Sequence, residues 1–509
     1  MRVPALEVRG IHKWFGVNHA NRDVSFAVGG GSIHGIVGEN GAGKSTIMSI
    51  VYGFLPADGG EVRVGGRPIP IRSPRDAIAA GIGMVHQHFM LVDTFTVLEN
   101  VLLGAEGGPM LGAGMAHVRA ELQRLQRDYG LEVDPDARTG DLPVGLQQRV
   151  EILKALFRGA GILILDEPTG VLTPQEVEHL FRILRALRDQ GRTIIIITHK
   201  LREIMDLTDH VTVMRRGEVV ASVATAETSR ERLAELMVGR RVLLRVDKAP
   251  ARPGEAVLDV EGLSVVDGRG VARVKDVSFS VRAGEIIGIA GVSGNGQSEL
   301  LEALAGIRPI RSGTVRLRGE PASERRDVFT AWGLRRAGVA HVPEDRQKVG
   351  LVVSFEANES AILGYQGDRE YNGRVLMDRG AVVARCDREM SAYDVRPHSP
   401  RLTTASFSGG NQQKIVLARE IERSPDLLLV GQPTRGVDIG AIEFIHRRLI
   451  QLRDQGKGLV LVSAELDEIM ALSDRILVMF DGRLVGEMPG GEATERRLGL
   501  MMAGITETA

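Results

Sequence analysis

The hydrophobic pattern alternates short, β-rich apolar runs with amphipathic segments along the whole chain. Residues 33–37 (IHGIV) form one such run and are predicted to be a strand, whereas the segment from Lys44 through about Tyr52 has the pattern of a helix. Runs such as 162–165 (ILIL) and 194–197 (IIII) are far shorter than the roughly 18 residues that a membrane-spanning helix needs. We therefore expect an α/β fold and no membrane crossing by this chain itself.

The chain also repeats itself. Residues 31–47 (GSIHGIVGENGAGKSTI) align with residues 284–300 (GEIIGIAGVSGNGQSEL), and later segments match in the same order. These later matches are 162–176 with 427–441 and 197–214 with 462–479. The repeat predicts two homologous halves, residues 1–244 and 256–509, joined by the polar, proline-containing linker 245–255.

Composition narrows the class of protein further. The chain has 64 basic and 65 acidic residues, so its net charge of -1 gives no indication of a nucleic-acid partner. A single cysteine, Cys386, excludes an internal disulfide and fits a reducing cytoplasm. The first ten residues, MRVPALEVRG, lack the apolar core of a signal peptide, so secretion is not expected.

The segment GENGAGKST, residues 38–46, has the spacing of a phosphate-binding loop. In such a loop, backbone amides surround the phosphates, a lysine reaches the terminal phosphates and a hydroxyl binds magnesium. Its place between a predicted strand and a predicted helix adds the amides and the positive dipole end of that helix. The candidate nucleotide-binding residues of this loop are Gly38, Asn40, Gly41, Gly43, Lys44, Ser45 and Thr46.

Further motifs follow this loop in a fixed order. They are Gln87 in MVHQHFML, a signature-like stretch just before a helix, ILILDEPT (162–169) and His199 in ITHK. The ordered set resembles the ATP-binding cassette (ABC) ATPases, and the resemblance covers nearly the whole chain, twice over. Three segments are most similar to the tandem ATP-binding subunits of ribose-type importers, and within that group to the nucleoside branch. These segments are HQHFMLVDTFTVLENV (86–101), SGGNQQK (408–414) and QPTRGVDIGAIEFIH (432–446).

The first half contains the groups that ATP hydrolysis needs, namely a phosphate cradle, a metal site and a means to polarise water. Lys44 is suited to the β- and γ-phosphates, and Ser45 with Asp166 is suited to Mg²⁺. Glu167 stands beside the metal ligand and is placed to polarise the attacking water. The sequence therefore predicts a complete catalytic set in the first half.

Three more first-half residues receive roles through the resemblance. Gln87 would act at the metal and the attacking water, and His199 at the γ-phosphate. Phe15 occupies the place where the family stacks an aromatic ring on adenine, with Trp14 as its neighbouring competitor. Taken singly, such a histidine or aromatic residue is more often structural, so these assignments depend on the ordered set of motifs.

The second half has lost these groups at the aligned positions. The counterparts are Gly268 for Phe15, Gln297 for Lys44, Glu344 for Gln87, Gly431 for Asp166, Gln432 for Glu167 and Ala464 for His199. A glutamine supplies no positive charge, a glycine cannot ligate magnesium, and Gln432 cannot act as a base. The second half should therefore hydrolyse ATP poorly or not at all.

The signature motifs show the opposite pattern. The second half keeps Ser408, Gly409, Gly410, Asn411 and Gln412, where the first half has Pro143, Val144, Gly145, Leu146 and Gln147. Pro143 offers a phosphate neither a hydroxyl nor an amide proton. In the family, each ATP lies between the phosphate loop of one domain and the signature of the other. The resemblance thus implies one complete site, which would use Ser408, Gly409, Gly410 and Gln412, and one depleted site. Because Gly291, Gly294 and Gly296 still offer backbone amides, our hypothesis is that the depleted site binds nucleotide without hydrolysing it; the alternative is an empty structural loop.

The resemblance implies an α/β fold of two tandem P-loop ABC ATPase domains, each a mixed β-core with a helical signature subdomain, packed head to tail as an internal pseudo-dimer. Such a chain would use ATP and Mg²⁺ to energise nucleoside import at the cytoplasmic face of the cell membrane. Two transmembrane permease subunits would dock on residues 89–100 and on the region after Glu344, and an extracytoplasmic substrate-binding protein would act indirectly.

Two alternatives remain at this point. Ribose, galactose or another simple sugar is the alternative substrate, because the same motifs occur in the sugar branch. A soluble tandem cassette ATPase acting on ribosomes or DNA is a more distant alternative. Such proteins usually keep both phosphate loops intact and carry a long charged segment between the cassettes, and this chain has neither feature.

Overall fold

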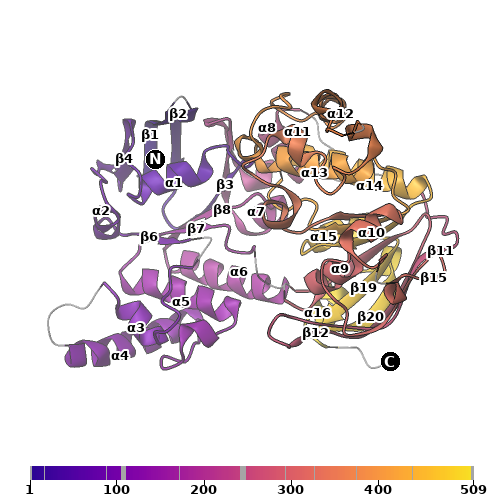
Figure 1. The fold of residues 1–509 in the computed structure, drawn as a ribbon. Helices are drawn as coiled ribbons and strands as arrows, with labels where there is room; N and C mark the ends of the chain where they lie inside the picture. Colours follow the sequence, from indigo (N-terminus) through magenta and orange to yellow (C-terminus); the bar gives the residue numbers. More distant parts are fainter. Residues whose placement is uncertain are drawn as a thin grey trace. The chain divides into compact units, whose positions relative to one another are not determined.

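The computed structural model describes residues 3–16, 18–86, 89–104, 111–170, 172, 174–240, 248–292, 294–325, 327–373, 375–437 and 439–505. The chain divides into two compact units, Met1–Leu244 (the first unit) and Arg245–Ala509 (the second unit). Each unit contains one four-stranded and one six-stranded sheet with helices around them (Figure 1).

The first unit has a four-stranded antiparallel sheet of order β2-β1-β4-β5 and a six-stranded sheet of order β10-β9-β3-β8-β7-β6. In the larger sheet five strands run parallel and β10 pairs antiparallel with β9. The strands are β1 (Leu6–Phe15), β2 (Asn18–Val28), β3 (Ile33–Val37), β4 (Gly59–Val64), β5 (Arg67–Pro68), β6 (Ile82–Val85), β7 (Ile162–Asp166), β8 (Thr193–Ile197), β9 (His210–Arg215) and β10 (Glu218–Ala224).

The helices of the first unit fall into those that flank the sheets and a separate helical group. Helices α3, α4 and α5 contact one another and form this group, drawn in purple in Figure 1. The helices are α1 (Lys44–Val51), α2 (Pro74–Ala79), α3 (Val97–Leu102), α4 (Leu111–Tyr129), α5 (Val144–Phe157), α6 (Pro174–Asp189), α7 (Leu201–Leu207) and α8 (Arg230–Val238).

The second unit repeats this arrangement, with sheets of order β12-β11-β14-β15 and β16-β17-β18-β13-β19-β20. Helices α11, α12 and α13 contact one another as the corresponding helical group. Its strands are β11 (Ala256–Val266), β12 (Ala272–Arg282), β13 (Ile286–Ala290), β14 (Ser312–Leu317), β15 (Glu320–Pro321), β16 (Val339–Val342), β17 (Leu427–Gly431), β18 (Gly458–Val462), β19 (Arg475–Phe480) and β20 (Arg483–Pro489). Its helices are α9 (Gln297–Leu304), α10 (Ala331–Arg336), α11 (Ala357–Ser360), α12 (Arg379–Ala392), α13 (Gly409–Ile421), α14 (Ile439–Asp454), α15 (Leu466–Leu472) and α16 (Glu495–Met502).

The parallel strands are the short apolar runs of the sequence. Residues 194–197 are fully buried in β8, because helices and the second sheet cover both faces of a parallel sheet. The predicted strand 33–37 is β3, and the helix predicted from Lys44 is α1. The predicted α/β class, with a helical group in each unit, is confirmed, while the head-to-tail packing stays a prediction.

The predicted linker 245–255 is described from residue 248 onward, and its first described residues bind the second unit. Lys248 Nζ donates hydrogen bonds to the carbonyl oxygens of Leu472 and Ser473, and Arg453 Nη2 donates to the carbonyl of Ala249. Across the described ranges, no helix combines the length and the hydrophobicity needed to cross a bilayer.

Candidate functional site

The phosphate loop of the first unit connects the end of β3 to the start of α1. Gly41 and Gly43 have φ angles of 81° and 95°, in the left-handed region that favours glycine. A Cβ on Gly43 would lie 2.6 Å from the carbonyl oxygen of Ala20, and one on Gly38 would lie 2.3 Å from that of Met214. Glycine is therefore required at these positions, because neighbouring backbone packs directly against the loop.

Lys44 begins α1 and is buried, with its ammonium inside the loop. Its Nζ donates to the carbonyl oxygens of Gly38 at 2.8 Å and Glu39 at 3.0 Å. Asn21 supports the loop from outside, because its Nδ2 donates to the carbonyl of Gly43 at 3.1 Å. An ammonium held in this position can exchange its carbonyl partners for phosphate oxygens, which accept stronger, charge-assisted bonds.

The acidic pair stands at the end of β7. Asp166 is the last residue of that strand, and Glu167 follows with a φ of 46°. The Glu167 amide donates to the carbonyl of Ile197 at the end of β8, at 2.8 Å. Glu167 Oε1 lies 2.8 Å from His199 Nδ1, so the fold brings together an acid and a histidine that are distant in the sequence.

The pKa values of the two acids are shifted in opposite directions. Burial opposes ionisation of Glu167, but the hydrogen bond and charge of His199 and the charge of Lys44 bring its pKa below the ordinary value. Burial, and then the charge of Glu167, raise the pKa of Asp166, against which the hydrogen bond from Ser45 acts. Glu167 is therefore a stable carboxylate, and a cation beside Asp166 would relieve the repulsion between the two acids.

Two aromatic rings stand at the end of β1. Trp14 is stacked on His19, with ring centroids 3.5 Å apart and planes 8° apart. Phe15 is 47% exposed, and Lys13 Nζ lies 5.8 Å from its ring centroid. Trp14 is 48% exposed, so exposure does not distinguish the two rings, and the stacking of Phe15 on adenine stays a prediction.

Gln87 lies outside the described residues. Its role at the metal and the attacking water stays a prediction. The described neighbour of Gln87 is His86, whose ring lies 5.2 Å from that of Phe54, centroid to centroid.

A cavity of about 140 Å³ opens beside His86 in the first unit. Its lining includes Tyr52, Phe54, His86, Met90, Lys154 and Arg158. One side of the cavity is formed by residues that follow α1 and by residues around β6, and the other side by helix α5.

The second unit keeps the backbone of the phosphate loop. Gly294 and Gly296 have φ angles of 92° and 102°, and Gln432 has the same φ of 46° as its counterpart Glu167. Inside this loop, Gln297 Nε2 donates to the carbonyl of Val292 at 3.3 Å. The cradle is thus preserved, while the ammonium of the first unit is replaced by a neutral amide.

The signature of the second unit lies at the start of α13, where Ser408 is the N-cap residue. Asn411 Nδ2 donates to Ser408 Oγ at 2.9 Å. Gln412 is 2% exposed, and its amide donates to the carbonyls of Thr404 and Phe407. Gln412 therefore supports the signature from inside, and its predicted contact with nucleotide stays a prediction.

The two signatures differ in the charge beside them. The guanidinium of Arg346 packs on Gly409, since a Cβ there would lie 2.4 Å from Nη2, and its Nη1 donates to the carbonyl of Arg435 at 2.8 Å. In the first unit, a Cβ on Gly145 would lie 2.5 Å from a carboxylate oxygen of Glu176. A guanidinium thus lies against the second unit's signature and a carboxylate against that of the first.

The start of α5 also differs from a phosphate-binding helix start. Pro143 is its N-cap residue, with φ of -53° and ψ of 150°, and its carbonyl accepts from the amides of Leu146 and Gln147. Having no amide proton, it presents only its ring to the space before the helix.

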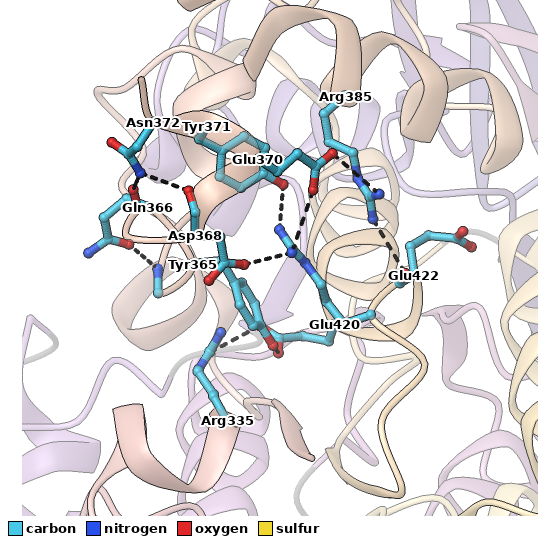
Figure 2. A network of polar contacts seen from close by, with 12 residues as sticks. Arg335, Tyr365, Gln366, Asp368, Glu370, Tyr371, Asn372, Arg385, Glu420 and Glu422 are labelled. Carbon is cyan, nitrogen blue, oxygen red and sulfur yellow. Dashed lines mark hydrogen bonds and ion pairs between the residues drawn. The ribbon is translucent and has the colours of Figure 1, made fainter. Parts of the chain in front are cut away.

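A buried charged network holds α13 in place. Glu420 is 0% exposed and accepts from Arg335 Nη2 at 3.0 Å, from Tyr365 OH at 2.8 Å and from Arg419 Nε at 2.8 Å. Figure 2 shows Arg335 and Tyr365 converging on Glu420. Arg419 Nη1 also donates to the carbonyl of Gly350, in the segment that follows Arg346. The network therefore joins the signature helix to that segment.

Sequence reasoning missed Arg346, Glu176 and the Arg419–Glu420 pair. Arg346 follows the aligned position Glu344 by two residues in VPEDR, which is the one local signal for it. Adjacent helix residues such as Arg419 and Glu420 usually point apart, so their spacing gave no indication of a shared buried network.

Two α/β units with a strand, phosphate loop and helix in each, and an acid–histidine pair beside the first loop, define a tandem P-loop ATPase. The ABC transporter family matches residues 21–170 and 274–435. The chain therefore belongs to the ABC transporter family and is an ATP-binding ATPase.

Curated relatives align with nearly the whole chain. The guanosine import ATP-binding protein NupO of Bacillus subtilis (strain 168) is 46% identical over 99% of this chain and 98% of its own length. The nucleoside import ATP-binding protein NupA of Lactococcus lactis subsp. cremoris (strain MG1363) is 45% identical over 98% of both chains. The ribose import ATP-binding protein RbsA 1 of Rubrobacter xylanophilus (strain DSM 9941 / JCM 11954 / NBRC 16129 / PRD-1) is 41% identical over 98% of both.

Proposed function

We propose that this ATPase energises the import of nucleosides across the cytoplasmic membrane, as a peripheral subunit on the cytoplasmic side. Two relatives at 45% and 46% identity are named for nucleoside or guanosine import, and relatives named for glucose and ribose import are 44% and 41% identical. A simple sugar is the second candidate substrate because of these two sugar-import relatives.

The observation that carries the catalytic proposal is the Glu167–His199 pair beside Lys44 and Asp166 in the first unit. Lys44 holds the β- and γ-phosphates, and Glu167 orients and polarises the attacking water through its ionised carboxylate. His199 fixes Glu167 and contacts the γ-phosphate. The second unit lacks an equivalent base, since Gln432 stands in the position of Glu167.

The first unit also fits a magnesium ion. Mg²⁺ prefers oxygen ligands and is often held by one or two protein groups together with substrate phosphates. Ser45 and Asp166 supply a hydroxyl and a carboxylate within hydrogen-bond reach of each other, and Gln87 is the third proposed ligand. Bound there, the metal would neutralise charge on the transferred phosphoryl group.

We propose that hydrolysis needs the signature of the second unit as well. The catalytic residues are intact only in the first unit, and Ser408, Gly409 and Gly410 are intact only in the second. The charge contrast supports this division, because Arg346 lies against the second signature and Glu176 against the first. The depleted site, which would pair the phosphate loop of the second unit with the signature of the first, would then bind nucleotide without hydrolysing it.

Docking of two permease subunits is proposed at the segments after Gln87 and Glu344. Phe54 and Met90, which line the cavity beside His86, are exposed, as is Phe95 in the same region. Val349 and Phe355 are exposed after Glu344. Apolar side chains gathered at a cavity are typical of a protein interaction surface. An extracytoplasmic binding protein would then deliver substrate to the permeases.

The proposal is tested by uptake of a labelled nucleoside into cells that carry this chain and its permease subunits. Wild type should accumulate label, Glu167→Gln should not, and unlabelled guanosine should compete while ribose should not. Competition by ribose alone would assign the sugar alternative, and uptake by Glu167→Gln would contradict the catalytic role of Glu167.

A further inference from the structure

The phosphate loop of the second unit has a hydroxyl–carboxylate pair although the aligned aspartate is absent. Strand β17 ends in Gly431, where β7 of the first unit ends in the carboxylate Asp166. By alignment alone the metal carboxylate is lost. The structure supplies a carboxylate at this position from another segment, because the Glu344 side chain extends to it from the loop after β16.

Two contacts define the position of Glu344. A Cβ on Gly431 would lie only 2.6 Å from Glu344 Cγ, so the side chain of Glu344 fills the room in which an aspartate at position 431 would begin. Ser298 Oγ donates to Glu344 Oε2 at 2.6 Å. In the first unit the equivalent hydroxyl, Ser45, bonds to Asp166. A hydroxyl–carboxylate pair of the same kind is therefore present in both loops.

The glycine and the glutamate depend on each other. Any side chain at position 431 would displace Glu344, and Glu344 supplies the carboxylate that accepts the hydrogen bond from Ser298. Relative to the first unit, Gly431 replaces an aspartate and Glu344 replaces a glutamine. The carboxylate thus comes from the loop after β16 and not from the end of β17.

Charge explains why a metal matters more in this loop. The first loop offers phosphates the ammonium of Lys44, whereas the second offers the neutral amide of Gln297. Backbone amides from Gly294 onward and the start of α9 remain as partners for phosphate. A divalent cation would offset both the phosphate charge and the charge of the Glu344 carboxylate.

We propose that the second unit binds a magnesium–nucleoside triphosphate complex, with Ser298 and Glu344 as the protein ligands of the metal. Gln432 and Ala464 provide no base beside this site, so the bound nucleotide is not hydrolysed. The proposal rests on the proposed function, in which the second unit is an ATP-binding cassette whose depleted site binds nucleotide without turnover.

Equilibrium dialysis of labelled ATP against the full chain tests this site without any turnover. The first unit is disabled by Lys44→Ala with Asp166→Asn, and binding is measured in MgCl₂ and in EDTA. ATP should bind, and Mg²⁺ should tighten binding about tenfold or more. Glu344→Gln should remove that increment. Glu302→Gln, which changes a nearby carboxylate that is paired with Arg308, should keep it.

A rescue variant separates a metal ligand from a merely structural residue. Glu344→Ala with Gly431→Asp returns the carboxylate to the end of β17 and should restore the magnesium increment. Absence of ATP binding in the disabled background, or an unchanged increment in Glu344→Gln, would overturn the proposal. The proposed function fails separately, through loss of import or turnover in the wild-type chain, whatever this binding shows.

Discussion

Replacing Glu420 by glutamine should destabilise the second unit and loosen its signature helix. The carboxylate is fully buried and accepts hydrogen bonds from Arg419, Arg335 and Tyr365. Glutamine keeps the volume but leaves two guanidinium groups without their counter-charge, and that of Arg419 is only 2% exposed. Breaking a buried ion pair costs about 3–5 kcal/mol, which lowers the Tm of a domain of this size by roughly 10 °C.

Hydrogen exchange read by mass spectrometry, together with a thermal scan, measures this effect. Peptides from α13 should exchange faster in Glu420→Gln, whereas those from α5, the matching helix of the first unit, should not change. Glu422→Gln is the matched control, because Glu422 is exposed and its carboxylate accepts a hydrogen bond from Tyr393 OH. Its cost should stay below about 1 kcal/mol.

The effect of Glu420 should also depend on pH. Burial alone would raise the pKa of this carboxyl, but Arg419 and Arg335 bring it below its ordinary value. A carboxyl with a lowered folded-state pKa stabilises the fold above its unfolded pKa and loses that contribution as pH falls through the folded pKa. The Tm gap between wild type and Glu420→Gln should therefore be full at pH 7 and shrink below about pH 4. A variant that melts like wild type at pH 7 would refute the reasoning.

Three other variants have defined outcomes. Phe15→Ala should weaken ATP binding about tenfold, because one stacking contact with the base is lost, whereas Trp14→Ala should change it less than about twofold. Titration with a fluorescent ATP analogue measures both variants. Equal effects would contradict the assignment of Phe15. Asp166→Asn should raise the Mg²⁺ concentration needed for half-maximal ATP hydrolysis about tenfold, and an unchanged magnesium titration would exclude Asp166 as a ligand. Phe54→Asp should prevent co-purification with the permease subunits while ATP binding by the isolated chain stays normal, and retained co-purification would contradict docking at the cavity.

Backbone features were predictable because short-range rules determine them. The glycine spacing of 38–46 already implied a loop that only glycine can form, and the positive φ angles of Gly41 and Gly43 follow from it. The apolar run 33–37 likewise predicted a strand, and this strand is the buried β3.

The sequence did not predict which side chains from distant segments lie next to one another. Glu344 reads in the alignment as the loss of a glutamine, and only the three-dimensional position of Gly431 reveals that the acid fills a vacated space. The charges beside the signatures were hidden likewise, because Arg346 and Glu176 come from segments distant in the sequence from the helix starts that they approach. Which residues approach one another across a fold depends on tertiary packing, which local patterns do not encode.

The central claim is that one hydrolytic site uses the catalytic set of the first unit and the signature of the second. It is tested most directly by the ATPase rate of the assembled transporter carrying Ser408→Ala, beside Glu167→Gln and wild type. Both substitutions should lower the rate about a hundredfold or more, although they lie in different units. Normal turnover by Ser408→Ala together with an inactive Glu167→Gln would contradict the shared site.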